Sequence, residues 1–131
     1  MNDHVQAYAE VAAVLQVYFD GLHHSDTDRL SRVFHPQAVY ATASADLPLI
    51  LRMDEYFPII DARPSPASRN EVRTDRIDSI EFVGPVTALA KLRCSIRPRH
   101  FIDILTLIHV EKRWQIIAKV FHFDAERPLA T

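Results

Sequence analysis

The chain has 131 residues, 48% of them hydrophobic and 24% charged, and its formal net charge is −2 at pH 7. Length and composition predict one domain over residues 1–131, with an apolar core that needs no disulfide or metal for stability. Because the arginines are scattered among acids, the chain lacks the clustered basic surface that nucleic-acid binding requires. Its single cysteine excludes an internal disulfide.

Several other classes are also disfavoured. No apolar run approaches the length of a membrane span. The first four residues lack the basic start and apolar segment of a signal peptide, so we expect a cytoplasmic protein. The seven histidines lack the tight spacing of a metal site, and two glycines are too few for a phosphate-binding loop. We therefore expect neither a metal nor a cofactor.

The first part of the chain has the pattern of two helices. Apolar residues over 5–22 recur at helical spacing, which predicts an amphipathic helix with an inward stripe. The stripe consists of Val11, Val14, Leu15, Tyr18 and Leu22. Ser25 and Asp28 resemble a capping pair for a short second helix, which Pro36 ends because a residue before proline avoids the α region.

The middle of the chain is less regular. Residues 38–42 predict a short strand, and the apolar stretch 47–52 is extended. Residues 54–62 predict a third helix, although Pro58 is awkward beyond a first turn. The prolines, serines and arginines of residues 62–70 predict a loop.

From residue 73 onward the period of the hydrophobic pattern becomes two. Strands are predicted over residues 73–83, 86–97, 100–110 and 113–123, separated by turn residues. Helices followed by antiparallel strands favour an α+β fold over an alternating α/β fold. We expect a curved antiparallel sheet with about three helices packed on its concave face.

Two-residue turns at 98–99 and 111–112 would set the register of the last three strands. They would place Cys94 opposite Asp103, and Asp103 opposite Val120. A three-residue turn would shift the register by one residue and exchange the two faces of the sheet.

In this register the two faces of the sheet differ. The more apolar face, expected beneath the helices, carries Asp103, Trp114 and His122. The other face keeps Ile104 and Phe121 in a large apolar patch, whereas a face left to water should alternate more cleanly. Such a patch is typical of a protein interface, so we expect a homodimer packed through the sheet.

Asp103 is the sharpest candidate for chemistry. A carboxylate on an apolar face loses its hydration unless a partner compensates, and buried acids are enriched at functional sites. His122 would lie diagonally across from Asp103, within reach of it. The two residues fit acid–base chemistry in a pocket and a buried structural pair equally well.

Two parts of the chain resemble one superfamily. Residues 18–22 (YFDGL), Asp26 and residues 34–38 (FHPQA) are similar to the opening of nuclear-transport-factor-two-like (SnoaL-like) domains. Residues 101–107 and 114–121 resemble the carboxy-terminal hairpin of the branch named the putative lumazine-binding family. The resemblance implies a cone-like, cystatin-like fold with an interior cavity, and usually a dimer. Its members include isomerases, dehydratases, polyketide cyclases and binding domains, so the fold alone does not indicate which function this chain has.

The resemblance also suggests a role for Tyr18, which by itself is simply an aromatic core residue. Ketosteroid-isomerase-like members place a pocket tyrosine at the matching point and a pocket acid on a late strand. Tyr18 and a protonated Asp103 would then both donate hydrogen bonds to a ligand oxygen. Residues 40–43 (YATA) hold no carboxylate where those isomerases have their general base. This departure argues against proton abstraction by the same mechanism.

The predicted pocket is completed by aromatic side chains. Phe101 and Trp114 could stack on a flat ring, although core packing is the simpler interpretation. The expected lining is Tyr18, Phe34, Tyr40, Phe101, Asp103, Trp114 and His122. We expect the ligand to be a small apolar or aromatic molecule.

Three functions remain open from the sequence. The first is a small-molecule-binding domain. The second is an enzyme of the isomerase, dehydratase or cyclase type that uses Asp103 and His122 as acid–base groups together with Tyr18. The third is a non-catalytic interaction domain with a vestigial cavity.

Overall fold

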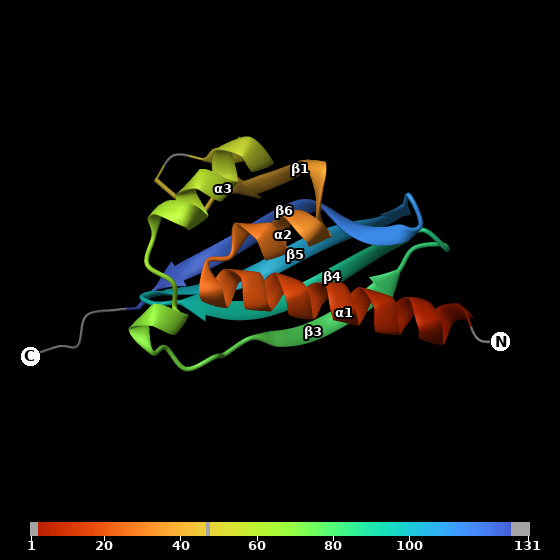
Figure 1. Cartoon of the computed structure of the whole chain (residues 1–131), viewed down its shortest axis with the longest axis horizontal. Helices are drawn as coiled ribbons and strands as arrows, with labels where there is room; N and C mark the ends of the chain where they lie inside the picture. The colour runs from red at the N-terminus through yellow and green to blue at the C-terminus, as the bar shows by residue number, and fades with distance from the viewer. Residues whose placement is uncertain (1–2, 47, 127–131) are drawn as a thin grey trace, which may run out of the picture.

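The structure is a computed structural model that describes residues 3–46 and 48–126 (Figure 1). Met1 and Asn2, which contribute to the expectation about a signal peptide, lie outside this range. Leu47, the first residue of the predicted extended segment, lies outside it as well. In the described part of the chain, none of the helices combines the length and apolarity needed to cross a bilayer.

Three helices form one layer of the molecule. They are α1 (Asp3–His24), α2 (Thr27–Val33) and α3 (Met53–Ala62), followed by the 3₁₀ turn η1 (Ala67–Arg69). The N-cap of α2 is Asp26, one residue later than predicted, because its side chain accepts a hydrogen bond from Arg29 N at 3.1 Å. Ser25 instead ends α1 with a positive φ of 50°.

The second layer is a curved six-stranded sheet. Its strands are β1 (Phe34–Thr42), β2 (Leu49–Arg52), β3 (Arg76–Phe82), β4 (Thr87–Ile96), β5 (Arg99–Val110) and β6 (Arg113–Ala125). The order is β2-β1-β6-β5-β4-β3, and the three helices pack on one face (Figure 1). The predicted α+β class, with three helices on a curved sheet, is confirmed.

The sheet is mixed, so the expectation of a fully antiparallel sheet was wrong. β1 runs parallel to β6, while every other neighbouring pair is antiparallel. Tight turns impose antiparallel pairing only on strands that follow one another directly. β1 and β6 are far apart in the sequence, so no turn connects them directly.

The turn between β4 and β5 lies one residue earlier than predicted. It occupies residues 97–98, so Cys94 faces Phe101 and Leu92 faces Asp103. The partner of Asp103 has therefore moved by two positions along β4. An even shift keeps the same side chains on the same face, and Asp103 points toward the helices as expected.

The turn between β5 and β6 lies at 111–112 as predicted, and both of its residues have positive φ, as two-residue hairpin turns favour. Farther along, the register shifts by one residue. Leu107 faces Ile116, but the preceding residue of β5, Thr106, faces Ala118. Ile117 is thus the extra residue of a β-bulge.

The bulge reverses the faces of the second half of β6. Beyond it, Lys119 and Phe121 are buried beneath the helices, while Val120 and His122 are exposed on the opposite face. The predicted positions of Val120, Phe121 and His122 were therefore wrong. A single inserted residue exchanges inward and outward positions in a strand.

Gly21 fixes how closely α1 approaches α2. A Cβ atom at this position would lie 2.6 Å from Cδ2 of the fully buried Leu30. A larger residue at this position would force Leu30 or one of the two helices to shift.

Candidate functional site

Tyr18 from α1 and Asp103 from β5 meet inside the molecule. The Tyr18 hydroxyl donates a hydrogen bond to Asp103 Oδ2 at 2.5 Å, and both residues have no exposed surface. Cys94 Sγ lies 4.0 Å from the same oxygen. Among the residues that the structure describes, nothing hydrogen-bonds the buried Oδ1. The sequence predicted both residues for the lining of one pocket; the structure brings them into contact, but neither lines the pocket described below.

Lys119 is the unexpected member of this group. The residue is only 4% exposed, and its ammonium group lies 5.1–5.5 Å from the ring centroids of Tyr18, Tyr40, Tyr56 and Phe121. Electron-rich ring faces attract a cation and partly replace the water that it loses. The ammonium group also donates to the Tyr56 hydroxyl at 3.3 Å. Since an ammonium group carries three donors, this bond leaves two N–H groups without a partner among residues 3–46 and 48–126.

Tyr18 connects the two buried charges. Asp103 and Lys119 are diagonal neighbours on β5 and β6, but they do not form an ion pair among the described contacts. The Tyr18 hydroxyl binds the carboxylate, while the face of its ring lies 5.2 Å from the ammonium group. The phenol therefore separates the charges and stabilises each of them.

Burial and charge together shift the pKa values in this group. Burial, followed by the negative charge of Asp103, raises the pKa of Tyr18 well above its usual value. The same two causes raise the pKa of the Cys94 thiol. Burial disfavours the charged form of Lys119, but interactions with Tyr56 and then Asp103 outweigh it and raise the pKa of the ammonium group. At neutral pH, Lys119 is a cation and the phenol and thiol are protonated.

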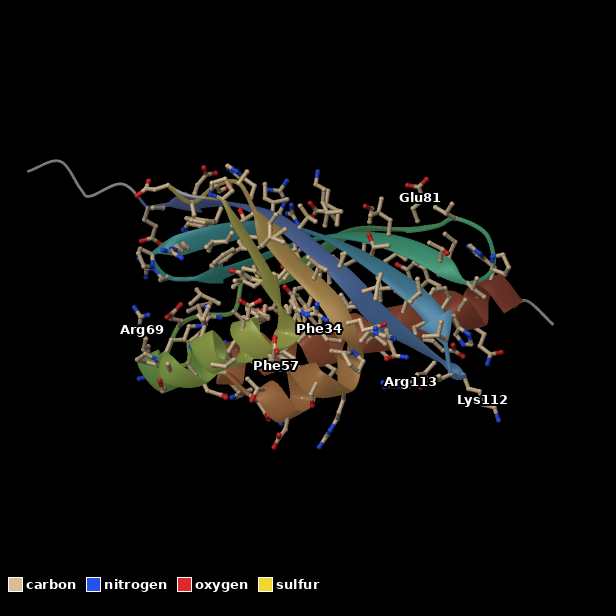
Figure 2. The ribbon with its side chains drawn as sticks, turned by 90° about the horizontal axis from the view of Figure 1, so that it is seen from above. Phe34, Phe57, Arg69, Glu81, Lys112 and Arg113 are labelled. Atoms are coloured by element: carbon tan, nitrogen blue, oxygen red, sulfur yellow. The ribbon has the colours of Figure 1, made fainter. Side chains whose placement is uncertain are left out.

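A narrow pocket leads from the surface to Lys119. Its lining comprises Leu22, Tyr40, Tyr56, Arg63, Cys94, Ile96, Arg99, Phe101 and Lys119. The space open to the centre of a water molecule is about 20 Å³, little more than the roughly 10–15 Å³ that one water needs. Side chains fill most of the space between sheet and helices (Figure 2). The wide interior cavity that the resemblance implies is therefore a tight channel here.

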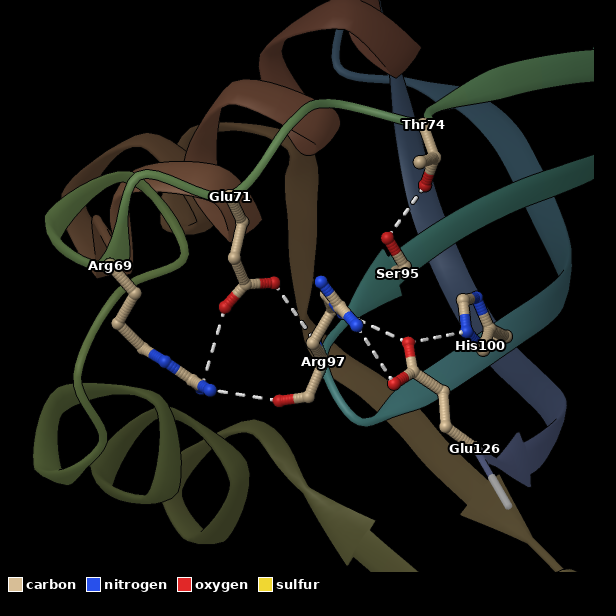
Figure 3. Close-up of polar contacts among 7 residues, drawn as sticks. All are labelled: Arg69, Glu71, Thr74, Ser95, Arg97, His100 and Glu126. Atoms are coloured by element: carbon tan, nitrogen blue, oxygen red, sulfur yellow. Dashed lines mark hydrogen bonds and ion pairs between the residues drawn. The ribbon is translucent and has the colours of Figure 1, made fainter. Parts of the chain in front are cut away.

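A polar network holds one wall of this pocket (Figure 3). The backbone N–H of Arg97 donates to Glu71 Oε1 at 2.9 Å, and its guanidinium group binds Glu126 at 2.9 and 3.1 Å. These bonds tie the loop after η1, the β4–β5 turn and the end of β6 together. Ile96 and Arg99, which flank this turn, line the pocket, so the network sets the position of that wall.

The aromatic residues predicted for the pocket divide into two groups. Tyr40 and Phe101 line it. Phe34 packs against Tyr18, at 5.9 Å between ring centroids, behind the pocket and between the two layers (Figure 2). Trp114 lies near the β5–β6 turn, where its ring contacts His109 at 5.3 Å, and it does not line the pocket.

The predicted contact between Asp103 and His122 does not form. His122 lies on the opposite face of the sheet, where its ring nitrogens bind Ser44 Oγ at 2.9 Å and Asp124 Oδ1 at 3.0 Å. The bulge at Ile117 is the reason, since it turned this part of β6 over. Lys119 occupies the interior in its place.

One feature of the sequence does indicate that Lys119 points inward, although it was not among the predicted site residues. Trp114 and Ile116 place apolar residues at even positions early in the strand, whereas Phe121 and Phe123 place them at odd positions later. A change of parity within one strand indicates a bulge, and beyond it Lys119 shares the inward face. Tyr56 and Arg63, on α3 and just after it, carried no comparable signal.

No cluster of three or more histidine, cysteine or acidic side chains suited to a metal ion occurs among residues 3–46 and 48–126. The polar groups that line the pocket are instead two phenols, a thiol, an ammonium group and two guanidinium groups. Such groups bind and orient organic molecules through hydrogen bonds.

Replacing Tyr18 with phenylalanine tests the buried hydrogen bond. The Tyr18→Phe variant leaves the Asp103 carboxylate without its donor, so the free energy of unfolding should fall by about 1–3 kcal/mol. Tyr8→Phe on the exposed part of the same helix is the matched control, because Tyr8 is 49% exposed. Urea denaturation measures both. Equal effects of the two substitutions would contradict the assigned bond.

Raised pKa values predict a loss of stability in alkaline solution. The usual pKa values are 9.0 for Cys94 and 10.0 for Tyr18, and both are raised in the folded protein. The unfolded chain therefore releases these protons first, so the stabilisation is complete below pH 9 and is lost as the pH rises further. Denaturation from pH 7 to 11 should show this decline, beginning later in Cys94→Ala. A flat profile would be inconsistent with the buried groups.

Comparisons with known proteins agree with this architecture. The NTF2-like protein of unknown function from Silicibacter pomeroyi DSS-3 has a TM-score of 0.82 and 21% identity, covering 95% of this chain and 100% of that one. One from Shewanella baltica OS155 has a TM-score of 0.82 and 25% identity, covering 93% and 97%. A protein from Caulobacter vibrioides with a cystatin-like fold has a TM-score of 0.62 and 15% identity, covering 91% and 90%.

No curated protein matches the sequence. The sequence pattern of the family described as "Putative lumazine-binding" matches residues 6–122, nearly the whole chain. The resemblance predicted from two short segments is thus confirmed. The protein shares its fold with proteins described as NTF2-like, and it belongs to the putative lumazine-binding family.

Proposed function

We propose that the protein is a small-molecule-binding domain whose ligand enters the pocket beside α3 and reaches Lys119. The main support is the incomplete hydrogen bonding of two buried charged groups. Lys119 has two N–H groups to spare, and Asp103 Oδ1 has no partner among the described residues. Native proteins satisfy most buried polar groups, and an unsatisfied one costs about 1–3 kcal/mol. Lys119 lines the pocket, so polar atoms of a ligand there would complete its hydrogen bonds.

The pocket walls favour a flat molecule. Tyr40, Tyr56 and Phe101 contribute aromatic faces beside the polar end of the pocket. An apolar lining with a few fixed polar groups is typical of small-molecule sites. The family description names lumazine, a planar bicyclic compound, which makes it one candidate.

The pocket must widen to admit such a molecule. Its present space of about 20 Å³ accommodates little more than one water. Arg63 and Arg99 are long side chains on the loop after α3 and at the start of β5. Rotation of these two side chains is the movement that would open the pocket with the least change in the backbone.

A thermal-shift survey tests this proposal. A metabolite collection that includes lumazine should contain a compound that raises the melting temperature by a few degrees, since 100-fold excess over Kd contributes about 2.7 kcal/mol. Lys119→Met and Tyr56→Phe should weaken binding of that compound, by about tenfold for the lysine. The control is Lys91→Met on the exposed face of β4, which should bind normally.

The outcome that opposes the proposal is equally definite. Binding that is unchanged in both Lys119→Met and Tyr56→Phe would place the ligand elsewhere. Failure of the whole collection to stabilise the protein would favour an interaction domain with a filled interior.

An enzyme of the isomerase, dehydratase or cyclase type is a second candidate. The free Oδ1 of Asp103 supports it, because this oxygen could accept a proton while Tyr18 fixes the other carboxylate oxygen. His122 cannot take part from the opposite face. The same variants separate the two functions, since Asp103→Asn should abolish turnover but only weaken binding.

We also propose that a second copy of the chain covers the exposed face of the sheet. Exposed apolar side chains gather there from four strands: Val39, Leu89, Ile104 and Val120, which are 36–49% exposed. Glu81 lies on this side of the sheet, away from the helices (Figure 2), and Lys91 is on the neighbouring strand. Because both charge signs surround the patch, it can pair with itself across a twofold axis.

Analytical ultracentrifugation tests the dimer. Ile104→Arg places a charge in the middle of the patch and should give a monomer, since a buried unpaired charge opposes association. Val72→Arg, at an 83% exposed position in the loop before β3, is the control and should leave the dimer unchanged. A wild-type protein that sediments as a monomer at all concentrations would refute the proposal.

A further inference from the structure

The pocket is surrounded by positive charge. Three of its lining residues, Arg63, Arg99 and Lys119, are cations, and none of its lining residues is acidic. They come from three separate parts of the fold: the loop after α3, the start of β5 and the buried half of β6. Three like charges around a narrow space repel one another unless an anion lies between them.

The three cations lack carboxylate partners. Within residues 3–46 and 48–126, none of them forms an ion pair. Arg63 Nε is buried and has no hydrogen-bond acceptor. Arg99 instead places its guanidinium group over the Phe123 ring, 4.6 Å from the centroid. Other arginines of the chain, such as Arg97, do pair with acids.

Tyr40 shows that the three charges act on one place. Burial raises the pKa of its phenol, whereas Lys119, Arg63 and Arg99 each lower it. The Lys119 ammonium group also lies 5.5 Å from the centroid of the Tyr40 ring. All three positive charges therefore converge near the phenol that forms one wall of the pocket.

The acid inside the fold does not neutralise them. Asp103 uses one oxygen for the Tyr18 hydroxyl, and it forms no ion pair with Lys119. The three cations that line the pocket thus outnumber the one acid nearby. Of the three, Lys119 is buried, and a buried cation is costly without a counter-charge, which an anionic ligand would supply.

From these contacts we infer that the ligand is a planar organic acid. Its carboxylate accepts hydrogen bonds from Lys119 and Arg63, and its ring lies against Tyr40 and Phe101. The inference rests on the proposed small-molecule function and narrows the ligand to a chemical class. A carboxylate suits the site because it is flat, carries one charge and accepts several hydrogen bonds, two of them from a guanidinium group.

Benzoate and benzamide form the deciding pair of probes. They have nearly the same shape and ring, but only benzoate is charged at pH 7. Isothermal titration calorimetry, in a buffer free of other carboxylates, should show binding of benzoate and at least tenfold weaker binding of benzamide. Raising the salt concentration should weaken benzoate binding, as expected for attraction between charges.

Matched variants locate the bound anion. Arg63→Gln and Lys119→Met should each weaken benzoate binding about tenfold, as expected for loss of a charge-assisted hydrogen bond. Arg32→Gln, at an exposed position of α2 outside the pocket, is the control and should bind benzoate normally. Arg63 is only partly buried and follows the helix, so its variant preserves the test if Lys119→Met fails to fold.

Each result decides between distinct conclusions. Equal binding of benzoate and benzamide would overturn the anionic class while leaving the pocket in place. Benzoate binding that survives both pocket variants would also overturn it. Acetate binding as tightly as benzoate would refute the role of the ring. If benzoate does not bind but an uncharged metabolite does, the inference fails and the proposed small-molecule function stands.

Discussion

One extra residue in β6 determines the chemistry of the interior. The bulge at Ile117 turns Lys119 beneath the helices and moves His122 to the opposite face. Without it, the interior would pair a carboxylate with an imidazole, the arrangement of an acid–base site. With it, the interior holds a carboxylate and an ammonium group separated by a phenol. A bulge next to a functional site is a common way to redirect a side chain.

The buried Lys119 must be stabilised by the residues that surround it. An ammonium group removed from water needs compensation, and here four aromatic rings and one hydroxyl provide part of it. These aromatic side chains come from α1, β1, α3 and β6. Helices and sheet are thus held together around one charge, and Gly21 allows the close helix packing that brings Tyr18 to its place.

The buried polar groups are only partly satisfied by hydrogen bonds and ion pairs. Asp103 keeps one oxygen free, Lys119 keeps two donors free, and the two arginines at the pocket have no carboxylate partners among the described residues. A purely structural core would be more stable with these groups satisfied or replaced by apolar ones. In the proposed function, a ligand supplies the hydrogen-bond partners that these groups lack. Because the pocket is narrow, the proposed function requires Arg63 and Arg99 to move when a ligand enters.

Much of this protein follows from its sequence. The stripe that contains Tyr18, the period of two after residue 73 and the turn at 111–112 depend on neighbouring residues alone, and they predict the α+β class and the inward position of Asp103. The family was predicted separately, from the resemblance of two segments of the chain. The parallel contact of β1 with β6, the bulge at Ile117 and the meeting of Lys119 with Tyr56, Arg63 and Arg99 were decided by the tertiary structure. The reason is physical: local patterns determine which side of an element is apolar, but pairing between distant strands and the packing of α3 determine which charged groups share an enclosed space.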